Sequence, residues 1–264
     1  MIISFKNNFF FSTLIIISLL IFTSCAGNKS NNIEYNERSL STIYNTALDN
    51  LINEDFEEAA LQFDEVERQH PYSEWAKKSI IMSSYSSFKN RDYLKSEANL
   101  KRFLELYPAS TFAAYAQFLL SMCYYSQIND IKRDQTSAKL AYEGFQLIMD
   151  RYPNTKYAEN SYYKLILLEN YLAAKEMDVA MTYVSLKKYI SSLKRYKEVV
   201  NNYQSSSYVP EALFRLVEIY LILGVRDEAI INARVLGYNY PKSKWYKYCY
   251  RLLKKNNLIN KKKI

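Results

Sequence analysis

One short phrase recurs five times along the sequence, and it constrains the fold more than any other feature. Each copy starts with proline, or once with glutamine, has serine or threonine two positions later, and has an aromatic residue two positions after that. Proline ends the preceding helix, the hydroxyl caps the next one, and the ring packs between neighbouring helix pairs. The phrase therefore predicts five regular boundaries between helices. The copies are Pro71–Ala76, Pro108–Ala113, Pro153–Ala158, Gln204–Val209 and Pro241–Tyr246.

A small residue stands twelve positions before each copy, and a bulky residue follows it four positions later in all copies but the last. A small side chain lets the two helices of a hairpin approach closely, and the bulky partner lies one turn along the same face. Polar turns also precede Phe56, Tyr93 and Tyr189. This is the helix-turn-helix pattern of tetratricopeptide repeats. The small residues are Ala59, Ser96, Ala141, Ser192 and Ala229, and the residues four positions on are Phe63, Leu100, Phe145, Tyr196 and Ala233.

The copies lie 37, 45, 51 and 37 residues apart, whereas the tetratricopeptide repeat has about 34 residues. The middle units therefore carry insertions, and the interval from residue 153 to residue 204 has room for an additional helix. We predict an all-α, right-handed solenoid of about five repeats, with about eleven helices from Ser39 to Lys255 and a concave face. Residues 39–154 form repeats 1–3 in this prediction, and residues 155–255 form repeats 4–5 with the inserted helix. A plain helical bundle is the alternative, but it has no need for the same phrase at each boundary.

Composition agrees with a helical chain. The 264 residues include only 4 Gly and 5 Pro, whereas sandwiches and barrels need turn residues every few positions. The net charge is +8, but the residues from Arg251 onward contribute six cations and no acid. The near-neutral remainder lacks the positive field that nucleic-acid binding requires. We expect the basic tail, residues 256–264, to be a solvated end, with contact to anionic lipid headgroups as the alternative.

The N-terminus has the features of a secretory signal. Lys6 precedes an uncharged run from Phe9 to Phe22, which is shorter than the roughly 20 residues of a membrane-spanning helix. Thr23 and Ser24 then precede Cys25, as in the lipobox of bacterial lipoproteins, although Phe22 replaces the usual Leu. We predict a signal peptide at residues 1–24, lipidation of Cys25 and a polar tether at residues 25–38. An ordinary signal peptide followed by an incidental cysteine is the alternative.

The remaining chemistry-bearing residues point to no reaction. Cys123 and Cys249 lie within apolar helical patterns, so we expect two buried free thiols rather than a disulfide. His70 is the only histidine, and no cysteine pair has metal-ligand spacing, so no metal site is predicted. The sequence has no nucleophile elbow and no phosphate loop. We therefore predict no catalytic residues and no cofactor.

Several phrases resemble one family, the outer-membrane assembly lipoproteins of the BamD type, over nearly all of the mature chain. Departures from the family pattern are Gln204 in place of proline, Ala180 where glycine is common, and the basic tail. The phrases and residues that carry the resemblance are Phe63–Glu67, Gln69–Ala76, Gln127–Gln135, Asp150–Pro153, Lys156–Glu159, Asn170, Leu172–Ala173, Lys175–Met177, Arg195–Tyr203 and Val209–Leu213.

The resemblance implies a lipid-anchored subunit on the periplasmic face of the outer membrane, in the complex that folds and inserts β-barrel proteins. It also implies that repeats 1–3 face unfolded barrel substrates, and that repeats 4–5 contact the periplasmic POTRA domains of the barrel-forming partner. Accessory lipoproteins are further possible partners. Arg195 matches a family position that pairs with an acid on the barrel-forming partner; taken alone it reads as a solvated charge.

Aromatic rings on a preformed concave surface can bind an extended, apolar-ended peptide at small entropic cost. The candidates in repeats 1–3 are Tyr72, Trp75, Tyr115 and Tyr124, and the competing interpretation is that these rings only fill the core. Two other functional classes stay open. Another repeat lipoprotein, serving pili or cell-wall machinery, would lack the phrases at Arg133–Gln135 and Lys175–Met177. A cell-wall enzyme would need a catalytic lobe for which no residues remain.

Overall fold

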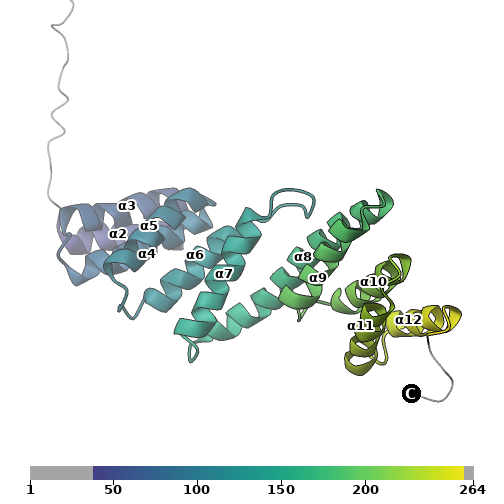
Figure 1. Cartoon of the computed structure of the whole chain (residues 1–264). Coiled ribbons are helices and arrows are strands. Elements are labelled where there is room, and N and C mark those ends of the chain that lie inside the picture. The colour runs from purple at the N-terminus through teal and green to yellow at the C-terminus, as the bar shows by residue number, and fades with distance from the viewer. Residues whose placement is uncertain (1–37, 259–264) are drawn as a thin grey trace, which may run out of the picture. The chain divides into compact units, whose positions relative to one another are not determined.

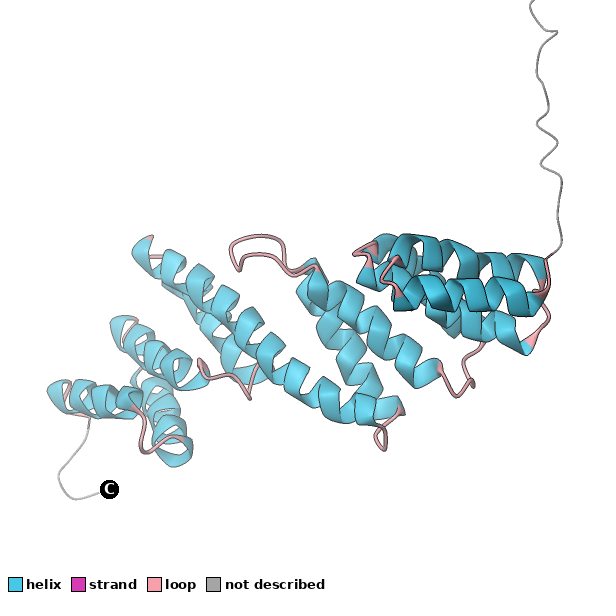
Figure 2. Ribbon diagram, turned by 180° about the vertical axis from the view of Figure 1, so that it is seen from behind, coloured by secondary structure: helices cyan, strands magenta, loops and turns pink. Residues whose placement is uncertain are grey.

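The computed structural model describes residues 38–258, and this part of the chain contains eleven helices and no strand (Figures 1 and 2). The predicted signal peptide, the lipidation site at Cys25, nearly all of the tether and most of the basic tail lie outside the described residues. The helices are α2 (Leu40–Ile52), α3 (Phe56–Gln69), α4 (Glu74–Lys89), α5 (Tyr93–Leu106), α6 (Ala113–Ser126), α7 (Thr136–Arg151), α8 (Lys156–Ser185), α9 (Tyr189–Asn202), α10 (Val209–Ile222), α11 (Arg226–Asn239) and α12 (Lys244–Lys255).

The helices form five hairpins and a final single helix. The hairpins are α2–α3, α4–α5, α6–α7, α8–α9 and α10–α11, and each also packs against the next, while α12 packs on α10 and α11 (Figure 1). Packing between successive neighbours is the arrangement of a repeat protein, in which no hairpin buries its apolar face alone. The prediction of an all-α stack of about five tetratricopeptide-type repeats, with about eleven helices, is confirmed.

The repeated phrase ends one hairpin and starts the next, as predicted. Ser73 and Thr155 are N-cap residues whose hydroxyls accept hydrogen bonds from backbone N–H groups three positions on, and Ser243 caps α12. The second and fourth copies differ from the prediction. There the hydroxyls of Ser110 and Ser206 accept from the N–H two positions later, and the helix begins after that turn.

The turns inside four of the five hairpins, all but α6–α7, share a conformation that the phrase does not encode. Glu54, Arg91, Lys187 and Gly224 all adopt positive φ, between 56° and 78°. In each turn the following N–H donates to a carbonyl five residues back, as Asp55 N does to Asn50 O at 2.9 Å. This is the Schellman end of a helix, and it reverses the chain in very few residues. Only one of the four positions is glycine; at the other three the side chain is exposed, and the hydrogen bond of the turn offsets part of the cost of the left-handed backbone.

The small residues of the pattern lie in the interior of the described helices. All five are completely buried, from Ala59 to Ala229. At two of them a serine hydroxyl reaches the preceding helix of the same hairpin: Ser96 Oγ donates to Ser84 O at 2.8 Å, and Ser192 Oγ donates to Ala180 O at 3.0 Å. A side chain at hydrogen-bonding distance from the next backbone leaves no room for a larger residue. The prediction of a close approach within the hairpin is confirmed at these two positions.

The prediction of an additional helix between residues 153 and 204 is wrong. The extra residues instead lengthen α8 into one continuous helix of 30 residues. No proline or glycine interrupts Lys156–Ser185, so nothing in the segment ends the helix before Ser185. The other insertion is the loop Gln127–Gln135 between α6 and α7. Neither α8 nor any other helix of the described residues is both long and apolar enough to cross a membrane.

Two apolar clusters fill the interior of the described residues. The smaller one centres on Ile43, Tyr44 and Phe63 of the first hairpin, and the larger one runs from Ile80 to Leu253. The larger cluster continues past residue 154, so the predicted division into residues 39–154 and 155–255 marks no gap in the core. That division stays a prediction about which side binds which partner.

Candidate functional site

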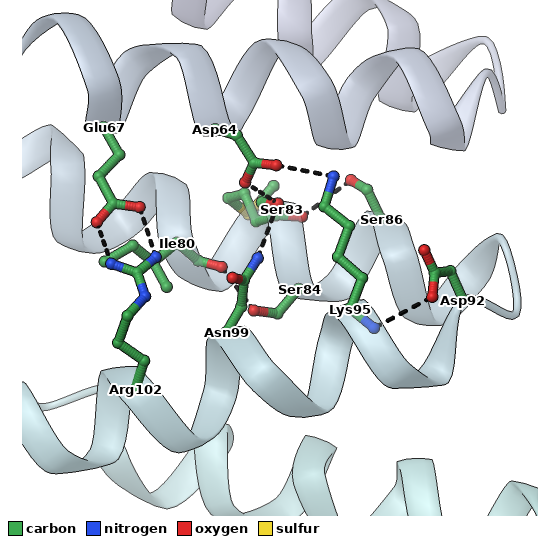
Figure 3. Close-up of polar contacts among 11 residues, drawn as sticks. Asp64, Glu67, Ile80, Ser83, Ser84, Ser86, Asp92, Lys95, Asn99 and Arg102 are labelled. Carbon is green, nitrogen blue, oxygen red and sulfur yellow. Dashed lines mark hydrogen bonds and ion pairs between the residues drawn. The ribbon is translucent and has the colours of Figure 1, made fainter.

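A polar layer joins the first two hairpins at the point where the apolar core is divided (Figure 3). Lys95 Nζ of α5 lies 2.7 Å from Asp64 Oδ2 of α3, and the Ser83 hydroxyl of α4 donates to the same carboxylate. Arg102 of α5 binds both carboxylate oxygens of Glu67 on α3, with Nη2 and Oε2 2.7 Å apart. The hydrogen bonds that Arg102 donates to Glu67 raise the pKa of its guanidinium. The family-like phrase Phe63–Glu67 is therefore explained by packing between hairpins.

Two of the four predicted substrate-binding rings are exposed, and they lie at one place. Tyr72 is fully exposed in the turn before α4, and Trp75, in the first turn of α4, is 44% exposed. The Trp75 ring packs edge-on against Tyr44 with centroids 4.7 Å apart, and Lys78 Nζ lies over both rings. A half-exposed indole held by a second ring and a cation is preformed, so a bound peptide loses little entropy in ordering it.

The other two rings belong to the interior. Tyr124 is only 8% exposed, and its hydroxyl donates to Glu97 Oε1 at 2.9 Å. Tyr115 is partly buried and packs against Tyr157, with ring centroids 5.5 Å apart. Burial raises the pKa of both phenols. Their expected contact with substrate does not fit this burial, and the core-filling interpretation explains both rings.

A second candidate surface lies where the α6–α7 loop crosses α8. The Tyr171 hydroxyl donates to Asn129 O, and Lys175 Nζ donates to Lys132 O at 3.2 Å. Within the loop, Asp134 Oδ2 accepts from the backbone N–H of Thr136, the first residue of α7, at 2.9 Å, and hydrogen bonds from Thr136 lower the pKa of the Asp134 carboxyl. The family-like phrases Arg133–Gln135 and Lys175–Met177 are thus brought together, with the side chains of Lys132 and Arg133 exposed.

Arg195 lies on α9, which packs against α8, and it forms an ion pair within the chain. Its Nη1 is 2.9 Å from Glu176 Oε2 of α8, and the pair raises the pKa of the guanidinium. The side chain of Arg195 is 45% exposed, whereas that of Glu176 is 16% exposed. Arg195 is therefore neither buried nor freely solvated. Glu176 fixes one side of the guanidinium and leaves its remaining N–H groups accessible to an acid on another molecule.

The fourth boundary, which has Gln204 in place of proline, is fixed by two side chains of α8. Asn170 Oδ1 accepts from Ser207 N at 2.9 Å and from the hydroxyls of Ser206 and Ser207. Glu169 Oε2 accepts from Ser205 N at 2.8 Å. These hydrogen bonds replace the conformational restriction that proline supplies elsewhere. The sequence marked Asn170 only as a family-like residue, and its role in holding this turn was missed.

The two cysteines of the described residues are free and buried, as predicted. Burial raises the pKa of the Cys123 thiol and of the Cys249 thiol to about 11 each, so both stay protonated and unreactive at neutral pH. Residues 38–258 contain no group of three or more His, Cys, Asp or Glu side chains that could hold a metal ion.

The family model described as YfiO, outer membrane lipoprotein, matches residues 36–249 of this chain. The chain belongs to this family. The match covers ten of the eleven helices completely and the first half of α12. It therefore includes both exposed surfaces, at Tyr72 and Trp75 and at Arg195.

Named relatives agree with the family. The outer membrane protein assembly factor BamD of Caulobacter vibrioides is 41% identical over 235 residues, covering 89% of this chain and 77% of the relative. The BamD of Rickettsia prowazekii is 37% identical over 243 residues, covering 92% of this chain and 96% of the relative. Among solved structures, the tetratricopeptide-repeat domain of P58(IPK) is 15% identical, with a TM-score of 0.43. The alignment covers 85% of this chain and 67% of the P58(IPK) chain.

Proposed function

We propose that this protein is an outer membrane protein assembly factor that acts as a binding scaffold and not as an enzyme. The observation that carries the proposal is family membership over residues 36–249, together with two relatives that are named as outer membrane protein assembly factors and align over most of their length. The fold suits the role, because stacked hairpins present long surfaces with separate places for separate partners. Other repeat lipoproteins, serving pili or cell-wall machinery, are disfavoured because the family match includes the phrases Arg133–Gln135 and Lys175–Met177.

On this proposal the α8–α9 hairpin contacts the periplasmic POTRA domains of the barrel-forming partner, with Arg195 paired to an acid of that partner. The exposed guanidinium of Arg195 suits an acidic group on a partner surface. Unfolded barrel proteins bind to repeats 1–3, with Tyr72 and Trp75 as the anchoring rings. Accessory lipoproteins are further candidates for the same complex.

Affinity purification of the tagged chain from solubilised membranes tests the assembly function. We expect the barrel-forming partner to co-purify in stoichiometric amount, and we expect depletion of the chain to lower the level of folded barrel proteins. Recovery of pilus or cell-wall components instead, with barrel assembly unaffected, would contradict the proposal.

Truncating the exposed rings tests the substrate surface. Tyr72→Ala with Trp75→Ala should weaken binding of a peptide copying the last strand of an outer-membrane barrel by about tenfold or more, since exposed aromatic anchors contribute about 1.4 kcal/mol or more. Fluorescence anisotropy of the labelled peptide measures the change. Tyr238→Ala is the matched control, because Tyr238 is also highly exposed but lies on α11. Equal loss in both proteins would place the peptide elsewhere.

Replacing the lipidated cysteine tests the anchor. Cys25→Ser removes the thiol that takes the diacylglycerol, so we expect the protein to remain uncleaved or to appear in the soluble periplasmic fraction. Metabolic labelling with palmitate followed by membrane fractionation measures both effects. Cys123→Ser is the control, since Cys123 is buried and should not affect labelling. Unchanged palmitate incorporation in Cys25→Ser would rule out this anchor.

A further inference from the structure

Positive charge is distributed unevenly along the chain, and much of the excess lies on one helix near its C-terminal end. After Glu228 the sequence contains ten lysine and arginine residues and no acid. Seven of the ten lie in the described residues, and five of these seven are on α12, which packs on α10 and α11. They are Lys244, Lys247, Arg251, Lys254 and Lys255. Residues 1–228 contain all 27 acids against 25 cations, so the positive end is not part of a wider basic surface.

The five cations share one face of α12. Lys247, Arg251 and Lys254 follow each other at spacings of four and three residues, which places them in one row on the side opposite the buried Cys249 and Leu253. All five side chains are exposed, and none takes part in the ion pairs found among residues 38–258. The nearby acids of α10, Glu211 and Glu218, are both paired with Arg215.

Tyrosines border this cationic row on both sides. Tyr248 lies on one edge of the exposed face and Tyr250 on the other, and each is 41% exposed. The guanidinium of Arg251 lies 4.9 Å from the Tyr248 ring centroid, so the aromatic edge and the cations form one surface. Lysine and arginine flanked by tyrosine or tryptophan form the pattern that interfacial helices present to lipid headgroups.

We infer that the exposed face of α12 binds an anionic lipid surface, as a second membrane contact distinct from the acyl chains on Cys25. The opposite face of α12 is packed in the core, so this contact is made by cations and tyrosines at the headgroup level and not by inserted apolar residues. A lipid surface fits better than a protein partner, because protein interfaces are depleted in lysine, and four of the five cations are lysines. The lysines of the tail, residues 261–263, extend the same charge in sequence.

Vesicle flotation of the processed chain, residues 25–264 carrying Cys25→Ser, tests the inference without any partner protein, because this chain has neither acyl chains nor the apolar signal segment. We expect binding to vesicles of phosphatidylethanolamine and phosphatidylglycerol, no binding to phosphatidylcholine vesicles, and loss of binding near 1 M salt, where the Debye length falls to about 3 Å. The variant Lys247→Gln, Arg251→Gln, Lys254→Gln should bind about two orders of magnitude more weakly, since each cation near an anionic surface contributes about 1 kcal/mol.

A matched control removes three exposed lysines elsewhere, with Lys139→Gln, Lys188→Gln and Lys194→Gln, and it should retain most of the binding. Circular dichroism checks that both triple variants fold, and Lys247→Arg with Lys254→Arg should bind as the unsubstituted chain does. Equal weakening in the two triple variants would reduce the effect to net charge and overturn the inference. So would tighter binding to duplex DNA than to anionic vesicles at the same salt concentration. Neither outcome affects the assembly function, which co-purification tests separately.

Discussion

Replacing Arg195 by glutamate is expected to remove the barrel-forming partner from co-purified material. Arg195 is exposed on α9 and oriented by Glu176, so its free N–H groups are fixed in direction before a partner arrives. Charge reversal then leaves like charges facing each other across a desolvated contact, which costs about 2–5 kcal/mol of binding. The measurement is quantitative co-purification, supported by titration of the purified POTRA domains onto the immobilised chain.

The intrachain pair complicates this variant, and two controls separate its effects. Glu176→Gln breaks the ion pair but keeps the cation, so it should retain the partner. Lys194→Glu reverses a neighbouring exposed charge on the same helix and should also retain it. Lys197 is a poorer control, because its ammonium lies 5.7 Å from the centroid of the Tyr220 ring on α10. If Glu176→Gln lost the partner as completely as Arg195→Glu, the role of Arg195 would be internal to the hairpin.

The sequence predicted the helix boundaries because each boundary depends on local chemistry. Proline, a capping hydroxyl and a ring act within a few residues of where they stand, and the cap hydrogen bonds of Ser73, Thr155 and Ser243 follow directly from their positions. The small residue of each hairpin was predictable for a related reason. Its spacing from the boundary is constant, so the periodicity alone identifies it.

The length of α8 could not be obtained from the spacing of the copies. An interval of 51 residues accommodates either an added helix or a longer one. What decides between them is the absence of any helix-ending signal inside Lys156–Ser185, followed by a left-handed turn at Lys187. A lysine at a positive-φ position gives no sequence signal comparable to glycine, so this turn was visible only in the structure.

Exposure of individual rings was also beyond the sequence. Tyr72 and Tyr124 both belong to tyrosine-rich, family-like repeats, yet one is fully exposed and the other contacts Glu97 on a different helix. The same limit applies to Glu176, which lies nineteen positions before Arg195. Such contacts depend on the register of one helix against another, and the register is set by many side chains at once.

The bulky residue of the third repeat allows the largest stability change to be predicted. Phe145 of α7 is fully buried and packs against the rings of Phe118 and Tyr125 of α6, with centroids 5.8 and 6.3 Å away. Phe145→Ala removes this ring from a close-packed interior. We expect the free energy of unfolding to fall by about 3–5 kcal/mol, provided that the cavity left by the ring does not collapse. For a chain of this size the melting temperature should fall by about 6–20 °C.

Phe112→Ala is the matched control, because Phe112 is 38% exposed in the turn before α6 and its truncation should cost far less. In a repeat protein stability is the sum of each hairpin and its interfaces, so the loss should be local. Hydrogen exchange should therefore accelerate first in α6, α7 and the adjoining part of α8, while α2, α3 and α12 stay protected. Uniform acceleration along the whole chain would show that the described hairpins unfold as one cooperative unit, and the argument from independent repeats would then be wrong.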